Sequence, residues 1–267
     1  MSPTKFYNRL KPMKTKTVFK YMGGVCITIM GIYIYLILFP QVLFSNKISY
    51  RNFKIYSNNK IDDKIYKIID NSIVQLKTCE IYDSTVLQKV FFMEGSFYFT
   101  LTRAFSKERA GFHEFLVNNT MVVPKVDEKN NALIYHDGKV CNLAQTIIHE
   151  TVHSLQESKL GFWRVMKIPE WKMEGYAFYI AKTDLILNNG HLSNKYVRDN
   201  IEDLIKHPSS SKHYWMDAVM TGYLLNERHL NFEQFMADDV KEDSTAKEIV
   251  DWYFNNSVTH EELISMK

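Results

Sequence analysis

The first long hydrophobic stretch of the chain runs from Tyr21 to Phe44 without a charged residue. At about 1.5 Å rise per residue, a helix of this length crosses the ~30 Å hydrocarbon core of a bilayer. A cleaved signal peptide has a shorter apolar core and a small-residue cleavage site, and no Ala-x-Ala follows this stretch. A soluble helix is rarely apolar on all sides. The pattern therefore predicts a retained transmembrane helix over residues 21–44.

After this stretch the hydrophobic spacing predicts strands first and helices later. Isoleucines at helical spacing predict a helix over residues 62–77. Aromatic and β-branched residues predict four strands, at 89–93, 97–101, 120–124 and 132–135. From residue 142 onward the pattern is mainly helical. Strands followed by helices favour an α+β fold over alternating βαβ units.

These patterns divide the chain into four segments. We expect a tail over residues 1–20, the membrane anchor over 21–44, a polar stalk over 45–60 and one folded domain over 61–267. The length that remains after the anchor suits a single domain.

The charge distribution sets the expected topology and excludes one class of partner. The tail carries six basic residues and no acid, which leaves 27 of the 33 basic residues against all 30 acidic ones, a balance of −3. A nucleic-acid-binding protein does not usually keep its excess positive charge in one terminal tail. The positive-inside rule places the tail in the cytoplasm and the large C-terminal part outside, so the chain is expected to be a single-pass protein of the cell membrane.

The clearest chemical signal is the run His149-Glu150-Thr151-Val152-His153. On a helix, residues four apart lie on one face, one turn apart, so the two imidazoles can bind one metal ion. Glu150 can lean towards that metal without binding it. The run therefore predicts a metal site on a helix.

The surrounding residues support this helix independently. Asn142, followed three residues later by Gln145, resembles a capping box. An apolar stripe lies on a different face from the histidines, formed by Leu143, Ile147, Ile148, Val152 and Leu155. We therefore expect the helix to start near Asn142.

A catalytic zinc ion needs a third protein ligand and one open coordination position. Pro169 is well placed to open a second helix, and Glu174 would lie about one turn inside it. Glu170 is the alternative ligand, but it sits at the frayed first turn. The sequence thus predicts Zn²⁺ bound by His149, His153 and Glu174.

These two segments resemble the gluzincin branch of the zinc metallopeptidases. More narrowly, they resemble small bacterial peptidases of the peptidase MA-like or minigluzincin group, which have H-E-x-x-H and a downstream W-x-x-E-G-x-A, here Trp171 to Ala177. The resemblance covers about residues 115–185. It implies a zincin-like fold with a small mixed sheet, an active-site helix, a helix carrying the glutamate and further C-terminal helices. It also implies that His149, His153 and Glu174 bind zinc and that Glu150 is the catalytic base.

Two features of the family pattern are not fixed by this sequence. Many gluzincins place an acid four residues after the ligand glutamate, where it orients a zinc-bound histidine, and here that residue is Phe178. Asp184 and Asp217 are both candidates for this role. A second oxyanion donor is also expected, and Tyr223 is the candidate, with His213 and Tyr214 behind it.

The sequence therefore predicts a membrane-anchored zinc metallopeptidase that hydrolyses peptide bonds outside the cytoplasmic membrane, with Glu150 as general base. Its partners would be a peptide or protein substrate and the lipid bilayer. By resemblance, strand 120–124 or 132–135 would bind an extended substrate by edge pairing. The alternative is a catalytically inactive zinc-binding module that binds a partner at the membrane surface. Whether Cys79 and Cys141 pair, and the oligomeric state, stay open.

Overall fold

The computed structural model describes residues 15–106, 109–115, 117–188, 191–193, 197 and 214–257. The chain divides into two compact units, residues 1–43 and 44–267, which are considered separately. The basic tail lies mostly outside the described residues.

The first unit contains one long helix, α1 (Thr15–Leu38), and the 3₁₀-helix η3 (Pro40–Leu43). The helix ends two residues before Pro40, because a proline disfavours helical backbone in the residue before it. By length and composition, the stretch Tyr21–Leu38 can cross a membrane, and none of it is buried. A signal sequence near an N-terminus has the same properties. The predicted apolar helix is therefore present.

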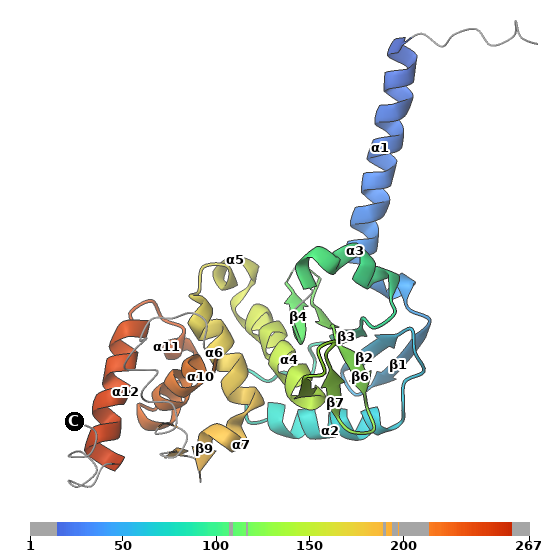
Figure 1. Cartoon of the computed structure of the whole chain (residues 1–267). Helices are drawn as coiled ribbons and strands as arrows, with labels where there is room; N and C mark the ends of the chain where they lie inside the picture. The colour runs from blue at the N-terminus through green and yellow to red at the C-terminus, as the bar shows by residue number, and fades with distance from the viewer. Residues whose placement is uncertain are drawn as a thin grey trace, which may run out of the picture. The chain divides into compact units, whose positions relative to one another are not determined.

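The second unit is built around a five-stranded sheet of order β1-β2-β3-β5-β4 (Figure 1). Its strands in chain order are β1 (Asn46–Tyr50), β2 (Phe53–Ser57), β3 (Gln88–Phe92), β4 (Gly111–Glu114) and β5 (Asn119–Val122). The pairs β2–β3 and β3–β5 are parallel, whereas β1 and β4 pair antiparallel to their neighbours. The sheet is therefore mixed, as predicted, and β4 forms one of its edges.

The first two strands replace the predicted stalk. Phe53 and Ile55 of β2 are almost completely buried, and β1 pairs with β2 along its whole length. The stalk prediction was wrong because it took the polar residues of β1, an edge strand, as a sign of a linker. An edge strand with one solvated face carries such residues.

Helices connect the parallel strands. The helix α2 (Lys64–Leu76) runs between β2 and β3 and confirms the helix predicted over 62–77. This is a βαβ unit, which the prediction of strands followed by helices did not include. The order of the elements is strands and crossover helices first, then helices.

The predicted strand over 97–101 is a helix, α3 (Phe97–Ser106). The Ser96 hydroxyl accepts a hydrogen bond from the backbone N–H of Phe99 at 3.1 Å, as an N-cap residue does. Tyr98 and Thr102, four residues apart, are the buried positions, which is a helical spacing. The aromatic content suggested a strand, but the cap and the spacing of the buried residues decide for a helix.

Two smaller sheets complete the strands. An antiparallel sheet of order β6-β7-β8 contains β6 (Lys125–Asp127), β7 (Ala132–Ile134) and β8 (Val140–Asn142). The short strands β9 (Leu187–Asn188) and β10 (His191–Leu192) pair with each other. The strands predicted at 89–93, 120–124 and 132–135 correspond to β3, β5 and β7, and are confirmed.

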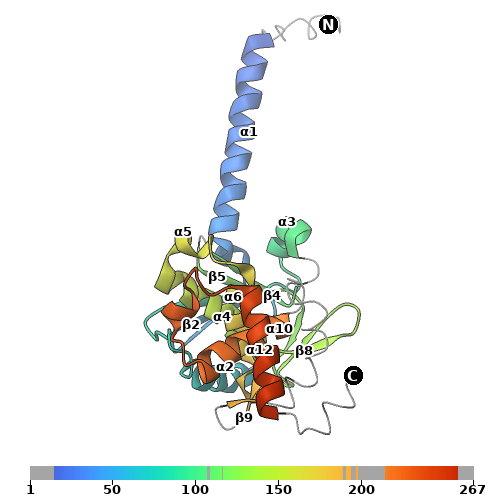
Figure 2. The ribbon, with the colours of Figure 1, turned by 90° about the vertical axis from the view of Figure 1, so that its left-hand side faces the viewer.

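From residue 143 the described chain is mainly helical, as predicted. The helices are α4 (Leu143–Leu160), α5 (Phe162–Val165), α6 (Glu170–Ala181), α7 (Thr183–Ile186), α10 (Tyr214–Gly222), the π-helix η4 (Tyr223–Glu227), α11 (Phe232–Phe235) and α12 (Glu242–Ser257). The helix α4 lies between the five-stranded sheet and the group α6, α10, α11 and α12 (Figure 1). Figure 2 views this unit from the helical side.

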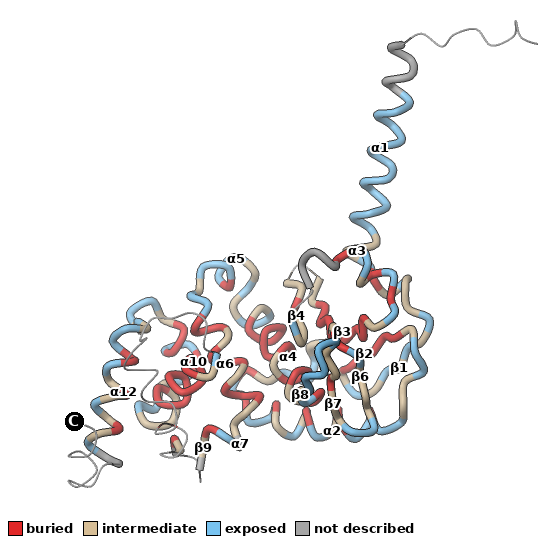
Figure 3. The backbone as a smooth tube through the Cα atoms, in the orientation of Figure 1, coloured by how far each residue is buried: buried red, intermediate tan, exposed pale blue. Residues whose placement is uncertain are grey.

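The core follows from this arrangement, because α4 is buried on both sides. Figure 3 shows the buried stretches concentrated in α4, α6, α10 and the central strands. The helices α6 and α10 approach especially closely at Gly175, where a Cβ atom would lie 2.6 Å from the Asp217 carbonyl oxygen. Only a glycine permits this approach.

The three cysteines do not form a disulfide. Cys26, Cys79 and Cys141 are all free. The buried Cys79 sulfur lies 3.5 Å from the Tyr176 hydroxyl. Cys79 and Cys141, whose pairing the sequence left open, are therefore separate thiols in this structure.

Candidate metal centre

The helix α4 starts where the sequence predicts. The Asn142 side chain accepts a hydrogen bond from the backbone N–H of Gln145 at 3.0 Å. The five residues of the predicted apolar stripe are all buried. Packing of this stripe on the core fixes the rotation of the helix, and the opposite face carries His149 and His153 towards α6.

The helix α6 supplies the third group. Pro169 precedes it at the N-cap position, with Glu170 in the first turn. Glu174 lies one turn further, in the part of α6 that packs against α4 and α10. Of the two acids weighed from the sequence, Glu174 is therefore the one next to the histidines.

The three side chains form a tight cluster. The Nε2 atoms of His149 and His153 lie 3.2 Å apart, and the two Glu174 carboxylate oxygens lie 3.2 Å and 3.4 Å from them. Ligand atoms around a tetrahedral zinc ion with bonds of about 2.0–2.1 Å are about 3.3–3.4 Å apart. The separations therefore fit one ion of this size, and these three residues form a group that could hold a metal ion.

The charges in the cluster are strongly coupled. Burial lowers the pKa of His153, but hydrogen bonding to Glu174 and the charges of Glu174 and Glu150 outweigh it and raise the pKa to about 9. Burial alone would raise the pKa of Glu174, but its hydrogen bonds with both histidines outweigh burial and lower the pKa. Without a metal, the cluster therefore holds a proton that a divalent cation would displace.

Glu150 lies beside the cluster with its side chain completely buried. Its pKa is raised, chiefly by burial and against the charges of both histidines. The carboxylate packs against Gly111 of β4, where an added Cβ atom would lie 3.0 Å from Glu150 Oε1 and 3.0 Å from the Met121 carbonyl oxygen. The position of Glu150 thus depends on a glycine in the edge strand, which sequence analysis did not identify.

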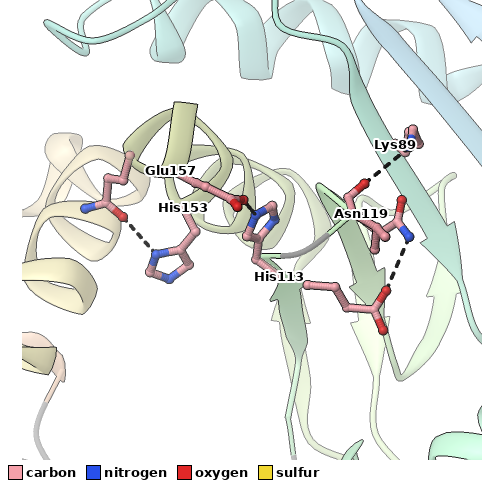
Figure 4. A network of polar contacts seen from close by, with 8 residues as sticks. Lys89, His113, Asn119, His153 and Glu157 are labelled. Atoms are coloured by element: carbon pink, nitrogen blue, oxygen red, sulfur yellow. Dashed lines mark hydrogen bonds and ion pairs between the residues drawn. The ribbon is translucent and has the colours of Figure 1, made fainter. Parts of the chain in front are cut away.

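A hydrogen bond ties the same strand to α4. His113 Nε2 of β4 lies 3.1 Å from Glu157 Oε2, as Figure 4 shows. Burial lowers the pKa of His113, and its other ring nitrogen has no partner among the described groups. The edge strand and the helix that carries the histidines are therefore fixed relative to each other.

A cavity of about 500 Å³ opens at the cluster. Its walls come from β4, α4 and α6, and it also contacts Arg109, Tyr135, Cys141 and Tyr214. One edge of β4 pairs with β5. The other edge is the end of the sheet, next to this cavity. The two strands predicted for substrate pairing have no free edge, because β5 lies between β3 and β4 and β7 lies between β6 and β8. That prediction was wrong, and β4 is an edge strand that lines the cavity.

The family-pattern position Phe178 contacts the first histidine. The rings of Phe178 and His149 meet edge to face with centroids 5.4 Å apart. Lys182 Nζ lies 4.8 Å from the centroid of the Phe178 ring. The Asp217 carboxyl is buried in α10, and no hydrogen bond joins it to either histidine in the described part of the chain. The side chain of Asp184 lies outside the described residues. Among the described side chains, Glu174 is therefore the acid that contacts His149, and none is placed at its outer nitrogen.

Tyr223 is not at the cluster. It begins η4, its ring packs on Trp252 at 5.9 Å, and it is hydrogen-bonded to Arg228. The tyrosines that line the cavity are Tyr135 and Tyr214, and the Tyr214 ring stacks on Phe178 at 5.9 Å. Of the two tyrosines weighed from the sequence, Tyr214 is thus the one at the cavity, because the helical spacing did not show which side chains face α6. His213 lies outside the described residues.

Comparison of the chain with protein-family models, with curated proteins and with solved structures found no match.

Proposed function

We propose that this chain is a zinc-dependent peptidase whose metal is held by His149, His153 and Glu174. One observation carries the proposal: two imidazole nitrogens lie at a zinc-like distance from each other and each from one oxygen of the Glu174 carboxylate, beside a cavity and a buried carboxylate. A zincin-like fold is part of the proposal. It is supported by the mixed sheet with an antiparallel edge strand, the H-E-x-x-H helix and the second helix with the glutamate.

Each residue then has a defined task in peptide hydrolysis. A zinc ion bound here would lower the pKa of a coordinated water and polarise the substrate carbonyl. Glu150 accepts the proton of the attacking water and delivers it to the leaving amine as the C–N bond breaks. Its buried setting raises its pKa, which suits a group that takes up and returns a proton.

Two further elements would bind the substrate. The free edge of β4 would pair with an extended peptide backbone, as an unpaired strand edge does. The Tyr214 hydroxyl would donate a hydrogen bond to the developing oxyanion from the cavity wall. The substrate is accordingly a peptide or a protein segment in extended conformation.

The location is proposed from the sequence and the apolar helix together. The helix α1 contains a stretch that can span a membrane, and the six basic residues before it favour a cytoplasmic N-terminus. The folded unit would then act outside the cytoplasmic membrane, anchored by one span.

A second candidate is a zinc-binding module without catalysis that binds a partner at the membrane surface. The observation that favours it is Phe178, which contacts His149 where an orienting acid is expected. A weakly oriented ligand would reduce both metal affinity and turnover.

One experiment separates the two candidates. The purified full-length chain in detergent would be loaded with zinc and incubated with a mixed peptide library. We expect cleavage that a chelator abolishes and added zinc restores. Glu150→Gln should keep stoichiometric zinc and reduce hydrolysis by about 10²- to 10⁴-fold, the contribution of general acid–base catalysis. Zinc binding without cleavage in the wild-type chain would instead support the binding module.

A further inference from the structure

We propose that Gln156 is a positioning residue of this metal centre: its side chain selects the nitrogen that His153 presents to the metal and couples that choice to the helix that carries Glu174. The inference rests on the proposed zinc site and deepens it. It assigns a function to a residue in the fourth turn of α4 that lies outside the H-E-x-x-H run.

The contacts of Gln156 are completely internal. The residue has no exposed surface. Its Oε1 atom lies 2.9 Å from His153 Nδ1, and its Nε2 atom donates to the Met173 carbonyl oxygen at 3.1 Å. Figure 4 shows the hydrogen bond on His153. Both polar ends of the amide are thus used, as a buried amide requires.

These partners determine the direction of both hydrogen bonds of the Gln156 amide. A backbone carbonyl only accepts, so the amide nitrogen of Gln156 must face Met173. The amide oxygen then faces His153 and can only accept, so His153 Nδ1 must carry a hydrogen. In the neutral ring this leaves the lone pair on Nε2, the atom that faces His149 and Glu174. The amide therefore selects the tautomer that a metal at this site needs.

The same amide links two ligands across two helices. Met173, whose carbonyl it holds, directly precedes Glu174 in α6. A shift of α6 relative to α4 would break the bond to Met173 and release the amide from His153. The orientation of one ligand is therefore tied to the position of another.

Among the described residues, the other histidine has no such partner. His149 contacts the Phe178 ring, which restrains the plane of the imidazole but cannot distinguish its two nitrogens. In the described part of the chain, Gln156 is the side chain that hydrogen-bonds the outer nitrogen of a cluster histidine. We therefore expect metal affinity to depend on it.

Three variants of the full-length chain in detergent test this assignment through zinc affinity, measured by competition with a chelator. Gln156→Met fills similar space without an acceptor and should weaken zinc binding about 10- to 100-fold, as loss of an orienting partner does. Gln156→Glu keeps an acceptor for Nδ1 and, as the neutral acid that burial favours, an O–H donor for the Met173 carbonyl, so its loss should stay below about tenfold. Thr151→Val, the control, removes another buried polar group of α4 whose hydroxyl has no partner among the described residues, and should leave the affinity unchanged.

The visible absorption spectrum of the cobalt-loaded protein gives a second readout that reports ligand geometry rather than stability. We expect the bands of Gln156→Met to shift and those of Gln156→Glu and Thr151→Val to stay close to wild type. If Gln156→Met binds zinc as tightly as wild type, or if Gln156→Glu is as weak as Gln156→Met, the assignment is overturned while the zinc site stands. A wild-type chain that takes up no zinc would overturn the proposed function as well. Should Gln156→Met fail to fold, a loss of zinc affinity well above tenfold in Gln156→Glu, with Thr151→Val unchanged, would still overturn the assignment.

Discussion

The two halves of the proposed metal centre are built on different principles. On one side, His153 is buried and its outer nitrogen is hydrogen-bonded to the fully buried Gln156. On the other, His149 is partly exposed and meets the Phe178 ring, with Lys182 beyond it. A hydrogen bond fixes both the direction and the tautomer of a ring, whereas an edge-to-face contact fixes only its plane. The first half is therefore preorganised, and the second can adjust when a metal or a substrate enters.

The largest expected effect is the loss of the preorganised ligand. His153→Ala removes one of three ligands and leaves Gln156 without its partner, so the variant should contain no stoichiometric zinc by elemental analysis. His149→Ala, on the adjustable half, should also lose zinc, but its zinc affinity should fall less than that of His153→Ala. The reason is that this variant leaves no buried amide without its partner. Stoichiometric zinc in His153→Ala would contradict the ligand assignment.

The position of Glu150 offers the next test, because it depends on β4 rather than on either histidine. Gly111→Ala places a Cβ atom 3.0 Å from both Glu150 Oε1 and the Met121 carbonyl oxygen, so the carboxylate must move. Misplacement of a reacting group by about 1 Å can cost about 10²-fold in rate. Here the neighbours must give by only a few tenths of an ångström, so we expect a smaller loss of hydrolysis, up to about tenfold, with zinc content unchanged.

The matched control for this variant is Gly138→Ala. Gly138 has a positive φ of 84°, and no atom lies near the added Cβ, so its strain is local and remote from Glu150. If both alanine variants lose hydrolysis equally, the loss reflects general destabilisation and not the position of Glu150.

The site illustrates which features a sequence reveals. The histidines, the Asn142 cap and Glu174 were predictable because helical spacing and capping are local rules. Gly111 and Gln156 were not, because their importance comes from a close approach between segments about 40 residues apart and from a hydrogen bond between two helices. Local sequence carries no signal for such contacts.

The same distinction holds for the fold. The helix over 62–77 follows from periodicity, and three of the four strands follow from their aromatic and β-branched residues. The stalk prediction failed at β1 and β2, because burial of Phe53 depends on pairing with β3, which is more than 30 residues away in the chain. At α3 the local Ser96 cap was present in the sequence, but the aromatic content was given more weight.

A smaller effect is expected from giving the adjustable half an acid. Phe178→Asp introduces a carboxylate at the residue that now contacts the His149 ring. If it orients the outer nitrogen of that ring, zinc affinity should rise by up to about tenfold, at the cost of the stacking with Tyr214. Chelator competition measures the change, and Phe178→Asn separates the charge from the lost ring. An affinity equal to that of Phe178→Asn would show that the two halves do not differ in the way described.

The smallest effect concerns Asp217, the acid that the sequence offered as a partner for the cluster. Burial, followed by the charges of Glu242, Glu174 and Glu170, raises the pKa of its carboxyl to about 8. Asp217→Asn should leave zinc affinity unchanged, because no hydrogen bond joins this carboxyl to His149 or His153 in the described structure. Weakened zinc binding would show instead that Asp217 supports the adjustable half.

The variant should change the pH dependence of stability. The folded zinc-free chain holds the Asp217 proton up to about pH 8, whereas the unfolded chain releases it near the model-peptide value of about 3.9. The folded state therefore binds more protons between these values, so rising pH favours unfolding through this group. Urea denaturation of the zinc-free chain at pH 5, 6, 7 and 8 measures the free energy of unfolding. With rising pH, this free energy should increase in Asp217→Asn relative to wild type by up to about 1.4 kcal/mol per pH unit. Because the variant differs from wild type in one titrating group, the difference between the two curves removes the contributions of His113, Glu150 and His153. A constant difference over this range would mean that Asp217 is already ionised in the folded chain.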